Sequence, residues 1–118
     1  MRYDEMEQAG PYLRRFFNVD ERRWYYYHWC PACEEPHQYV TGDAGNLWTF
    51  NYNYLEPTFN PSMRIQSSEP RNAYEEIRPV HYTRCHYFIR DGKIDFCSDS
   101  PHGLAGKTVP LPKWAKKK

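Results

Sequence analysis

Residues 84–99, RCHYFIRDGKIDFCSD, decide the fold, because two strand-like runs flank the pair Asp91-Gly92. An Asp-Gly pair between alternating apolar residues is the strongest short-range signal for a two-residue β-hairpin turn. Counting outward from such a turn places His86 opposite Cys97. The sequence therefore predicts an antiparallel hairpin whose register is fixed by the turn.

The two faces of this hairpin differ in character, because side chains alternate along a strand. The apolar face, which should point to the core, carries Cys85, Tyr87, Ile89, Ile94, Phe96 and Ser98. The other face carries His86, Phe88, Arg90, Lys93, Asp95 and Cys97. Cys85 stands at the end of the core face, where a cysteine-bearing turn could dock.

Such a turn is present in residues 29–37, WCPACEEPH, where Cys30 and Cys33 are two residues apart around a proline. Tetrahedral zinc commonly takes one close pair of ligands from a tight turn and a second pair from elsewhere in the chain. Cys85 is the best third ligand. The strongest fourth ligand is His102, because it follows the strand that pairs with Cys85.

Two other histidines compete with His102 for the fourth position. His37 lies just beyond the cysteine turn, whereas His86 should point to the opposite face from Cys85. The alternatives to a metal site are a redox pair, which would require the cysteines at the start of a helix, and inert buried cysteines. Cys97, on the far face, is assigned to the inert class.

The composition predicts one small folded domain over residues 1–118. Leu, Ile, Val and Phe account for only 19 of 118 residues, but 11 Tyr and 4 Trp supply buried area in their place. The formal net charge of +1 argues against a dedicated nucleic-acid binder. The polar N-terminus lacks a signal peptide and no run could span a membrane, so we expect a cytoplasmic protein with reduced thiols.

The predicted fold is mainly β, a small α+β domain of antiparallel hairpins pinned by a zinc site. Segment 1–28 is expected to be an N-terminal extension and 113–118 a basic tail, with Pro11 able to open a short helix. The expected strands are residues 23–29, 37–40, 47–54 and 63–67, with turns at 30–36 and 56–62. Residues 68–79 are expected to form either a helix, with Ser68 as its cap and Pro79 at its end, or an exposed loop.

The blocks WCPACEEPH, WTFN, PTFNPS, CHYFIRDGKIDFCSDSPHGLAG and VPLP occur in this order over roughly residues 29–112. In these blocks the chain resembles a family of small phage and prophage proteins of unknown function. Some members carry the label ammonia monooxygenase, which a chain without a membrane segment does not support. The resemblance implies a phage origin, hence host cytoplasm, and a metal-binding core at Cys30, Cys33, Cys85 or His86, and His102.

The function expected from these observations is that of a non-catalytic binding module for a host or phage macromolecule, in the manner of a zinc knuckle. A protein partner would contact exposed tyrosines of the strands, or the segment 64–84; the tyrosines are Tyr25, Tyr27, Tyr52 and Tyr54. Such alternating aromatics also serve as cross-strand packing pairs.

Two alternatives remain open. The first is a zinc-dependent hydrolase using Asp99, His102, His37 or His86, although a thiolate-rich site is mostly structural. The second is a binder of single-stranded nucleic acid, for which arginines adjoin the aromatic run at 24–29. Interleaved acidic residues weaken the positive field that this second role needs.

Overall fold

The hairpin around Asp91-Gly92 is present in the computed structural model, which describes residues 5–42, 47–67, 69–78 and 80–114. Strands β7 (Tyr82–Arg90) and β8 (Lys93–Phe96) pair antiparallel, with Arg90 opposite Lys93. Asp91 and Gly92 have φ angles of 50° and 76°, the positive values that a type I′ turn requires. The expected register is confirmed as far as β8 extends.

The first sheet is a meander of four strands, β1 (Glu7–Ala9), β2 (Leu13–Asn18), β3 (Arg23–Cys30) and β4 (Glu35–Thr41). The cysteine turn connects β3 to β4, as expected. The expected short helix at Pro11 is wrong. The aromatic residues that follow it pair with those of β3 instead, so the segment forms β2.

The second sheet has the order β5-β6-β7-β8-β9. Its edge strands are β5 (Thr49–Phe50) and β9 (Thr108–Pro110), and β6 (Phe59–Ser67) lies between β5 and β7. The strand expected over residues 47–54 is reduced to β5, because asparagine side chains hold the following loop through hydrogen bonds to its backbone. The turn expected at 56–62 ends early, since β6 begins at Phe59.

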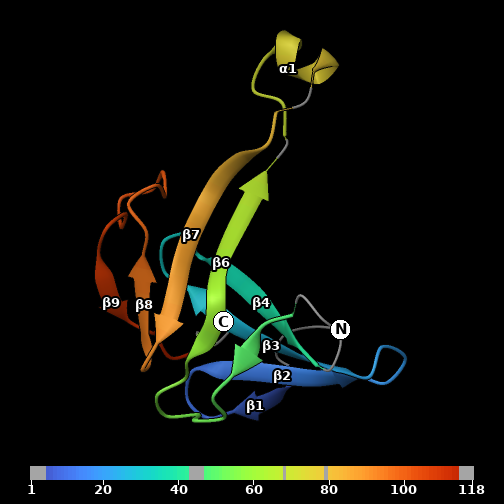
Figure 1. Ribbon diagram of the computed structural model, residues 1–118, viewed down its shortest axis with the longest axis vertical. Helices are drawn as coiled ribbons and strands as arrows, with labels where there is room; N and C mark the ends of the chain where they lie inside the picture. Colours follow the sequence, from blue (N-terminus) through green and yellow to red (C-terminus); the bar gives the residue numbers. More distant parts are fainter. Residues whose placement is uncertain (1–4, 43–46, 68, 79, 115–118) are drawn as a thin grey trace.

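Strands β6 and β7 extend beyond the rest of the sheet as an arm, and the helix α1 (Ala73–Ile77) lies at its far end (Figure 1). Asn72 caps this helix by accepting a hydrogen bond from the backbone N–H of Glu75 at 2.9 Å. The helix is shorter than expected. The predicted cap Ser68 and terminator Pro79 lie outside the described residues.

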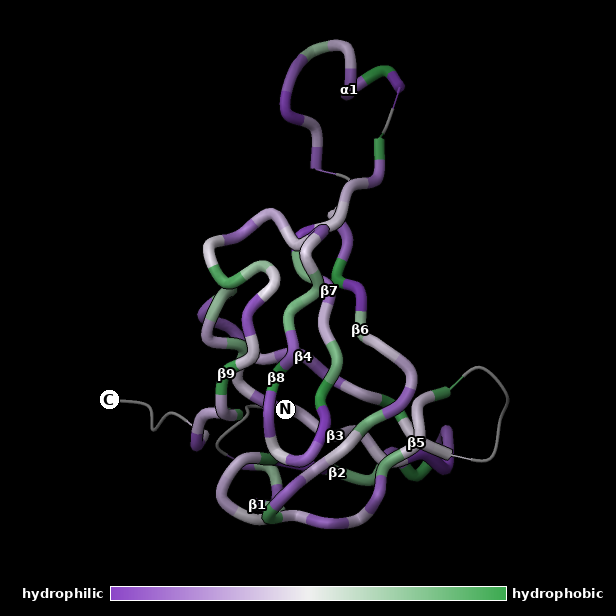
Figure 2. The backbone as a smooth tube through the Cα atoms, turned by 60° about the vertical axis from the view of Figure 1, so that its left-hand side comes forward, coloured by the Kyte–Doolittle hydropathy of each residue, from purple (hydrophilic) through white to green (hydrophobic). Residues whose placement is uncertain are grey.

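The core lies between the two sheets and is mainly aromatic. Tyr39 of the first sheet stacks on Phe59 of the second, with ring centroids 4.1 Å apart and an interplanar angle of 8°. Tyr26 and Tyr87 are also almost completely buried. Figure 2 shows hydrophobic stretches along β7 and β8, whereas the loop around α1 is mainly hydrophilic.

The predicted fold class is confirmed: the chain is mainly β, with two antiparallel sheets and one short helix in its described part. Among the described residues, no helix has the length and apolar character needed to cross a membrane.

Candidate active site and metal centre

Three polar side chains from distant parts of the sequence form a hydrogen-bonded chain on the outer face of the second sheet. Ser62 Oγ lies 3.1 Å from His86 Nε2. His86 Nδ1 in turn lies 3.0 Å and 3.2 Å from the two carboxylate oxygens of Asp99. A hydroxyl, an imidazole and a carboxylate in this order make the arrangement by which serine hydrolases activate their nucleophile.

The local structure of each strand explains why these side chains meet. The register between β6 and β7 shifts between Phe59 and Met63, and Ser62 lies in this irregular segment. Such an irregularity bends a strand and re-aims its side chains. His86 lies in β7 opposite Arg64, which is two residues beyond Ser62, so Ser62 and His86 are diagonal neighbours on the same face.

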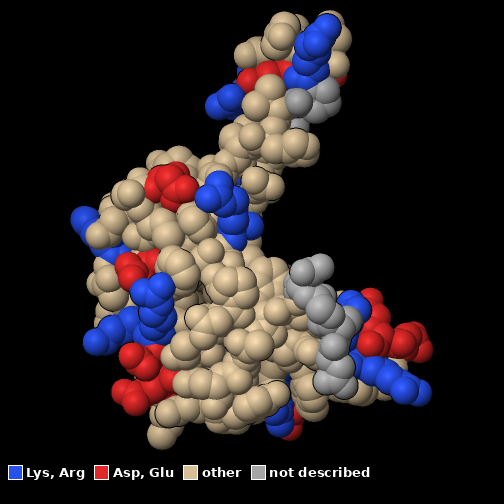
Figure 3. Space-filling view, in the orientation of Figure 1, with Lys and Arg blue, Asp and Glu red and all other residues tan. Residues whose placement is uncertain are grey.

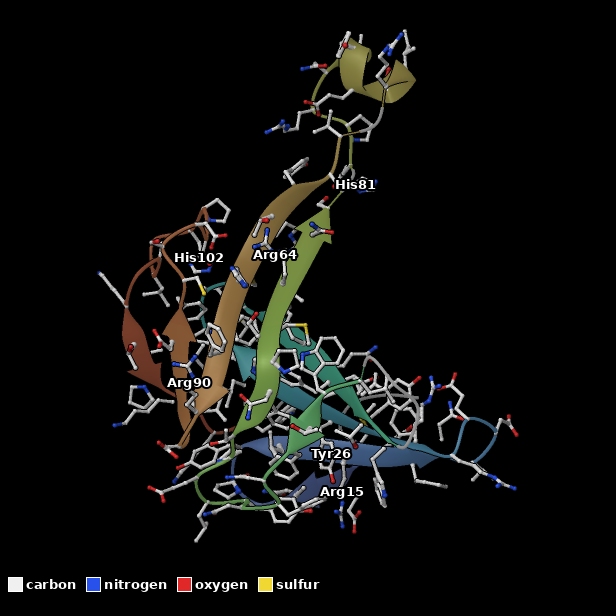
Figure 4. All side chains as sticks on the ribbon, viewed as in Figure 1. Arg15, Tyr26, Arg64, His81, Arg90 and His102 are labelled. Carbon is white, nitrogen blue, oxygen red and sulfur yellow. The ribbon has the colours of Figure 1, made fainter. Side chains whose placement is uncertain are left out.

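Asp99 reaches this face from the loop that follows β8. The loop is tied to β7 by Ser100, which is buried and bonds the backbone of His86. The Arg64 guanidinium lies 3.3 Å from the Asp99 carboxylate. Figure 4 shows Arg64 on the β6–β7 arm, and it shows His102 further along the loop that supplies Asp99.

The electrostatics of the site favour an ionised Asp99. The hydrogen bond with His86 lowers the pKa of this carboxyl below its ordinary value, and the charge of Arg64 acts in the same direction. The side chains of His86 and Asp99 are 17% and 51% exposed, so the site is open to a substrate. When Asp99 accepts a hydrogen bond from the Nδ1–H group of His86, the lone pair of His86 Nε2 faces the Ser62 hydroxyl.

On the opposite, core-facing side of β7, three cysteines come together as predicted. The sulfur atoms of Cys30, Cys33 and Cys85 all lie within 4.8 Å of one another. Cys30 and Cys85 are fully buried. Three thiols at this spacing could hold a metal ion.

The thiols of this cluster differ in acidity. The hydrogen bond from Cys85 lowers the pKa of Cys30 to about 6, and the backbone N–H of Cys33, which donates to the Cys30 sulfur over 3.5 Å, adds to this effect. Burial raises the pKa of Cys33 to about 11. The interaction with Cys30 also raises the pKa of Cys85 well above the ordinary value. Of the three thiols, Cys30 is therefore the one that loses its proton most readily.

The histidine candidates for the fourth ligand occupy three different environments. His102 Nε2 lies 3.2 Å from the Cys85 sulfur, so this imidazole adjoins the thiol cluster. His37 is instead bonded to the Tyr87 hydroxyl at 3.1 Å and lies 3.3 Å from Glu35. His86 belongs to the other face, as the alternation of the strand predicted.

Cys97 lies on the outer face, apart from the thiol cluster. It adjoins His86 and Asp99, with one donor atom of each residue within 4.8 Å of the others. Burial raises the pKa of its thiol. The predicted separation of Cys97 from the cysteine cluster is therefore confirmed, although its neighbours are the imidazole and the carboxylate of the hydrogen-bonded chain.

Sequence reasoning missed Ser62. It considered Asp99 and His86 only as partners of a metal and assigned Ser62 to a turn. Residues 62, 86 and 99 show no common spacing, and no Gly-x-Ser-x-Gly motif surrounds the serine. The one available signal was positional: the predicted strands 63–67 and 84–90 would pair, and a serine at the start of the first would then lie near a histidine in the second.

The comparisons with known proteins agree with the hydrogen-bonded chain on the outer face. Residues 3–97 match a family model described as bacterial ubiquitination-like system serine protease, BubE. Ser62 and His86 fall within the matched residues, and Asp99 lies two positions beyond them. No curated protein and no solved structure matches the chain.

This match corrects several expectations from the sequence. The resemblance to phage proteins of unknown function is wrong, since the matched family is BubE. The expectation of a non-catalytic binding module, and of a protein that is not an enzyme, is wrong because the family is one of serine proteases. For the same reason the zinc-dependent hydrolase, the nucleic-acid binder and the zinc-knuckle description are wrong.

Proposed function

This chain belongs to the BubE family of bacterial ubiquitination-like system serine proteases, and from that premise we propose that Ser62, His86 and Asp99 form its catalytic triad. The observation that carries the proposal is the continuous hydrogen-bonded chain from the Ser62 hydroxyl through the His86 imidazole to the Asp99 carboxylate. The proposed reaction is hydrolysis of a peptide bond in a protein substrate.

In the first half of the reaction, Ser62 Oγ attacks the carbonyl carbon of the scissile bond while His86 Nε2 accepts the hydroxyl proton. The tetrahedral intermediate then collapses as the imidazolium gives this proton to the leaving amine. The amine departs with the C-terminal part of the substrate, and the N-terminal part remains as an ester on Ser62.

In the second half, a water molecule gives a proton to His86 Nε2 and its oxygen attacks the ester carbonyl. Collapse of this second intermediate returns the proton to Ser62 Oγ and releases a carboxylic acid. Asp99 holds the imidazole in the tautomer that presents an unprotonated Nε2, and its negative charge stabilises the imidazolium in both halves.

A fluorophosphonate tests the proposed nucleophile directly, because this reagent forms a stable bond only with an activated serine. We expect labelling of the wild-type protein at Ser62, and none of the Ser62→Ala variant. Ser67→Ala, on the same strand, is the matched control and should label like the wild type. Labelling that persists in Ser62→Ala, or a wild-type protein that never reacts, would contradict the proposal.

We propose further that the metal suited to the thiol cluster is zinc, bound by Cys30, Cys33, Cys85 and His102. Thiolates with one imidazole are a donor set that zinc prefers, and closed sites of this kind are structural. The support is the mutual approach of the three sulfur atoms and the short distance from His102 to Cys85. The metal would hold the cysteine turn against β7 and would take no part in the proton transfers.

Elemental analysis of the purified protein tests this ligand set. One zinc per chain is expected, with loss of stoichiometric zinc in Cys85→Ala and His102→Ala. His37→Ala is the matched control and should retain the metal. Zinc that survives in His102→Ala but is lost in His37→Ala would assign the fourth position to His37.

A further inference from the structure

One edge of β6 has no neighbouring strand next to the catalytic serine. On one side β6 pairs with β7, and on the other side β5 pairs only with Phe59 and Asn60. Within the described ranges, no strand continues β5 along residues 62–67. In Figure 3 the molecule is hollowed on this side of the arm, beneath the region of α1. An edge of this kind is a template for pairing with another chain.

The backbone groups of Arg64 are directed toward this open edge. The N–H of His86 donates to Ser100 Oγ, and its carbonyl accepts from the N–H of Cys97 at 2.9 Å, so both groups point toward β8. The pair of His86 with Arg64 is therefore the type that shares no hydrogen bonds between β6 and β7. It follows that the N–H and the carbonyl of Arg64 point away from β7.

The carbonyl of Ser62 provides an independent check on this direction. Trp48, which precedes β5, donates from its indole N–H to this carbonyl at 3.2 Å. The Ser62 carbonyl therefore faces the β5 side, as the alternation from Arg64 requires. The open edge thus begins at Arg64, two residues from the nucleophile, and continues along the arm.

We propose that this edge binds the protein substrate as an added β-strand, so that an extended segment runs along β6 with its scissile carbonyl beside Ser62. The inference rests on the proposed function, since it assigns the substrate-binding surface of the same site. Backbone hydrogen bonds of this kind depend on the conformation of the bound chain rather than its sequence. The substrate class is therefore an extended, unfolded segment such as a tail or a flexible linker, and not a folded surface.

The test uses two serine-reactive reagents of different reach. A small alkyl fluorophosphonate reaches Ser62 without the edge, whereas an acetylated hexa-alanine diphenyl phosphonate can also pair with it. A series of the peptide reagent carries a single N-methyl group at successive amides. We expect the labelling rate to fall about fivefold at alternate positions and to change little between them, because only alternate N–H groups of a strand face its neighbour.

A pair of protein variants makes the same test from the other side. Arg64→Pro removes the N–H at the edge without removing a hydrogen bond to β7, and Arg64→Ala loses the same side chain but keeps the N–H. We expect the peptide reagent to label Arg64→Pro several-fold more slowly than Arg64→Ala, while the small reagent labels both at the same rate. If Arg64→Pro fails to fold, the N-methyl series on the wild-type protein still decides the question.

The outcomes separate the two proposals. Labelling by the small reagent with a flat N-methyl profile, or with equal peptide rates for the two Arg64 variants, would overturn the edge but leave the triad. A wild-type Ser62 that neither reagent labels would overturn the triad and the edge together.

Discussion

The hydroxyl of Ser100 forms two hydrogen bonds with the backbone of His86. It accepts a hydrogen bond from the backbone N–H of His86 at 2.9 Å and donates one to the backbone carbonyl of the same residue at 2.8 Å. Ser100 therefore supplements the backbone N–H of Cys97, which also donates to the His86 carbonyl, at this point of β7, just beyond the end of β8. Because Asp99 is the preceding residue, the same clamp fixes the carboxylate beside the imidazole.

Replacing Ser100 with Ala should lower kcat while leaving KM nearly unchanged, because the loss concerns the orientation of Asp99 and His86 rather than substrate binding. Stability should also fall by about 1–2 kcal/mol, since a buried N–H loses its acceptor. Ser100→Thr keeps the hydroxyl and should restore much of kcat. The measurement is steady-state cleavage of a peptide substrate together with urea unfolding. A kcat unaffected in Ser100→Ala would mean that the loop is held by other contacts.

Asp99→Asn should reduce kcat by about 10⁴-fold, because an amide at this position favours the wrong tautomer of the histidine. The fold should persist, as the carboxylate is half exposed. Asp95→Asn is the matched control: Asp95 lies on β8 and faces Arg90, outside the hydrogen-bonded chain. Comparable losses in the two variants would argue that the effect is one of general charge and not of the triad.

Cys33→Ser should remove the metal and abolish a cooperative unfolding transition, because the binding energy of a structural metal is part of the folding energy. Addition of a strong chelator to the wild-type protein should have the same effect. Cys97→Ser should retain both the metal and the transition, since Cys97 lies outside the thiol cluster. Circular dichroism during thermal unfolding, with metal analysis of each sample, makes the measurement. A wild-type transition indifferent to the chelator would refute a structural role for the metal.

The stability of the protein should decline in mild acid because of His28. Burial, with a contribution from the neighbouring His37, lowers the pKa of His28 to about 3 from an ordinary 6.5. Below about 6.5 the unfolded chain takes up a proton that the folded protein does not bind. The contribution of neutral His28 to the free energy of unfolding is therefore complete above that pH. It is lost, by up to ~1.4 kcal/mol per pH unit, as the pH falls toward the pKa of His28 in the folded protein.

His28→Gln serves as the comparison for this effect. Its free energy of unfolding should depend less steeply on pH than that of the wild type between pH 6.5 and the folded pKa of about 3. Urea titrations at a series of pH values give both slopes. Equal slopes would show that other groups account for the decline.

Gly92→Ala should destabilise the hairpin that carries β7 and β8. At a φ of 76° an added Cβ is strained, and it would lie 3.3 Å from the Cα of Glu56. We expect a loss of about 1 kcal/mol or more. Gly103→Ala is the matched control, because nothing lies within 4 Å of a Cβ there. Thermal unfolding of both variants measures the difference, and a Gly103 variant that loses as much would contradict the reasoning.

The sequence allowed the fold to be predicted where local signals dominate. Asp91-Gly92 set the register of the hairpin, and that register placed Cys85 on the core face and His86 on the outer face. The turn at Cys30 and Cys33 followed from its flanking aromatic strands. These features depend on residues close together in the chain.

What escaped prediction depends on long-range contacts. Ser62 reaches His86 through an irregular strand pairing that no local motif indicates, and Asp99 reaches the same imidazole from a loop beyond β8. The helix expected at Pro11 became a strand because its aromatic residues stack on those of β3. Tertiary pairing outweighed the local preference in this segment.

Cys85 and His86 are consecutive residues of one strand, and they belong to the two candidate sites on its opposite faces. A strand that slips by one position exchanges its faces, so a slip of β7 would direct His86 into the core and withdraw Cys85 from its cluster. No misregistered form of the protein could retain one site and lose the other. A single-residue insertion that shifts β7 would therefore disrupt both sites together. Length changes between relatives are expected at the tip of the arm instead, where they would leave the geometry of both sites unchanged.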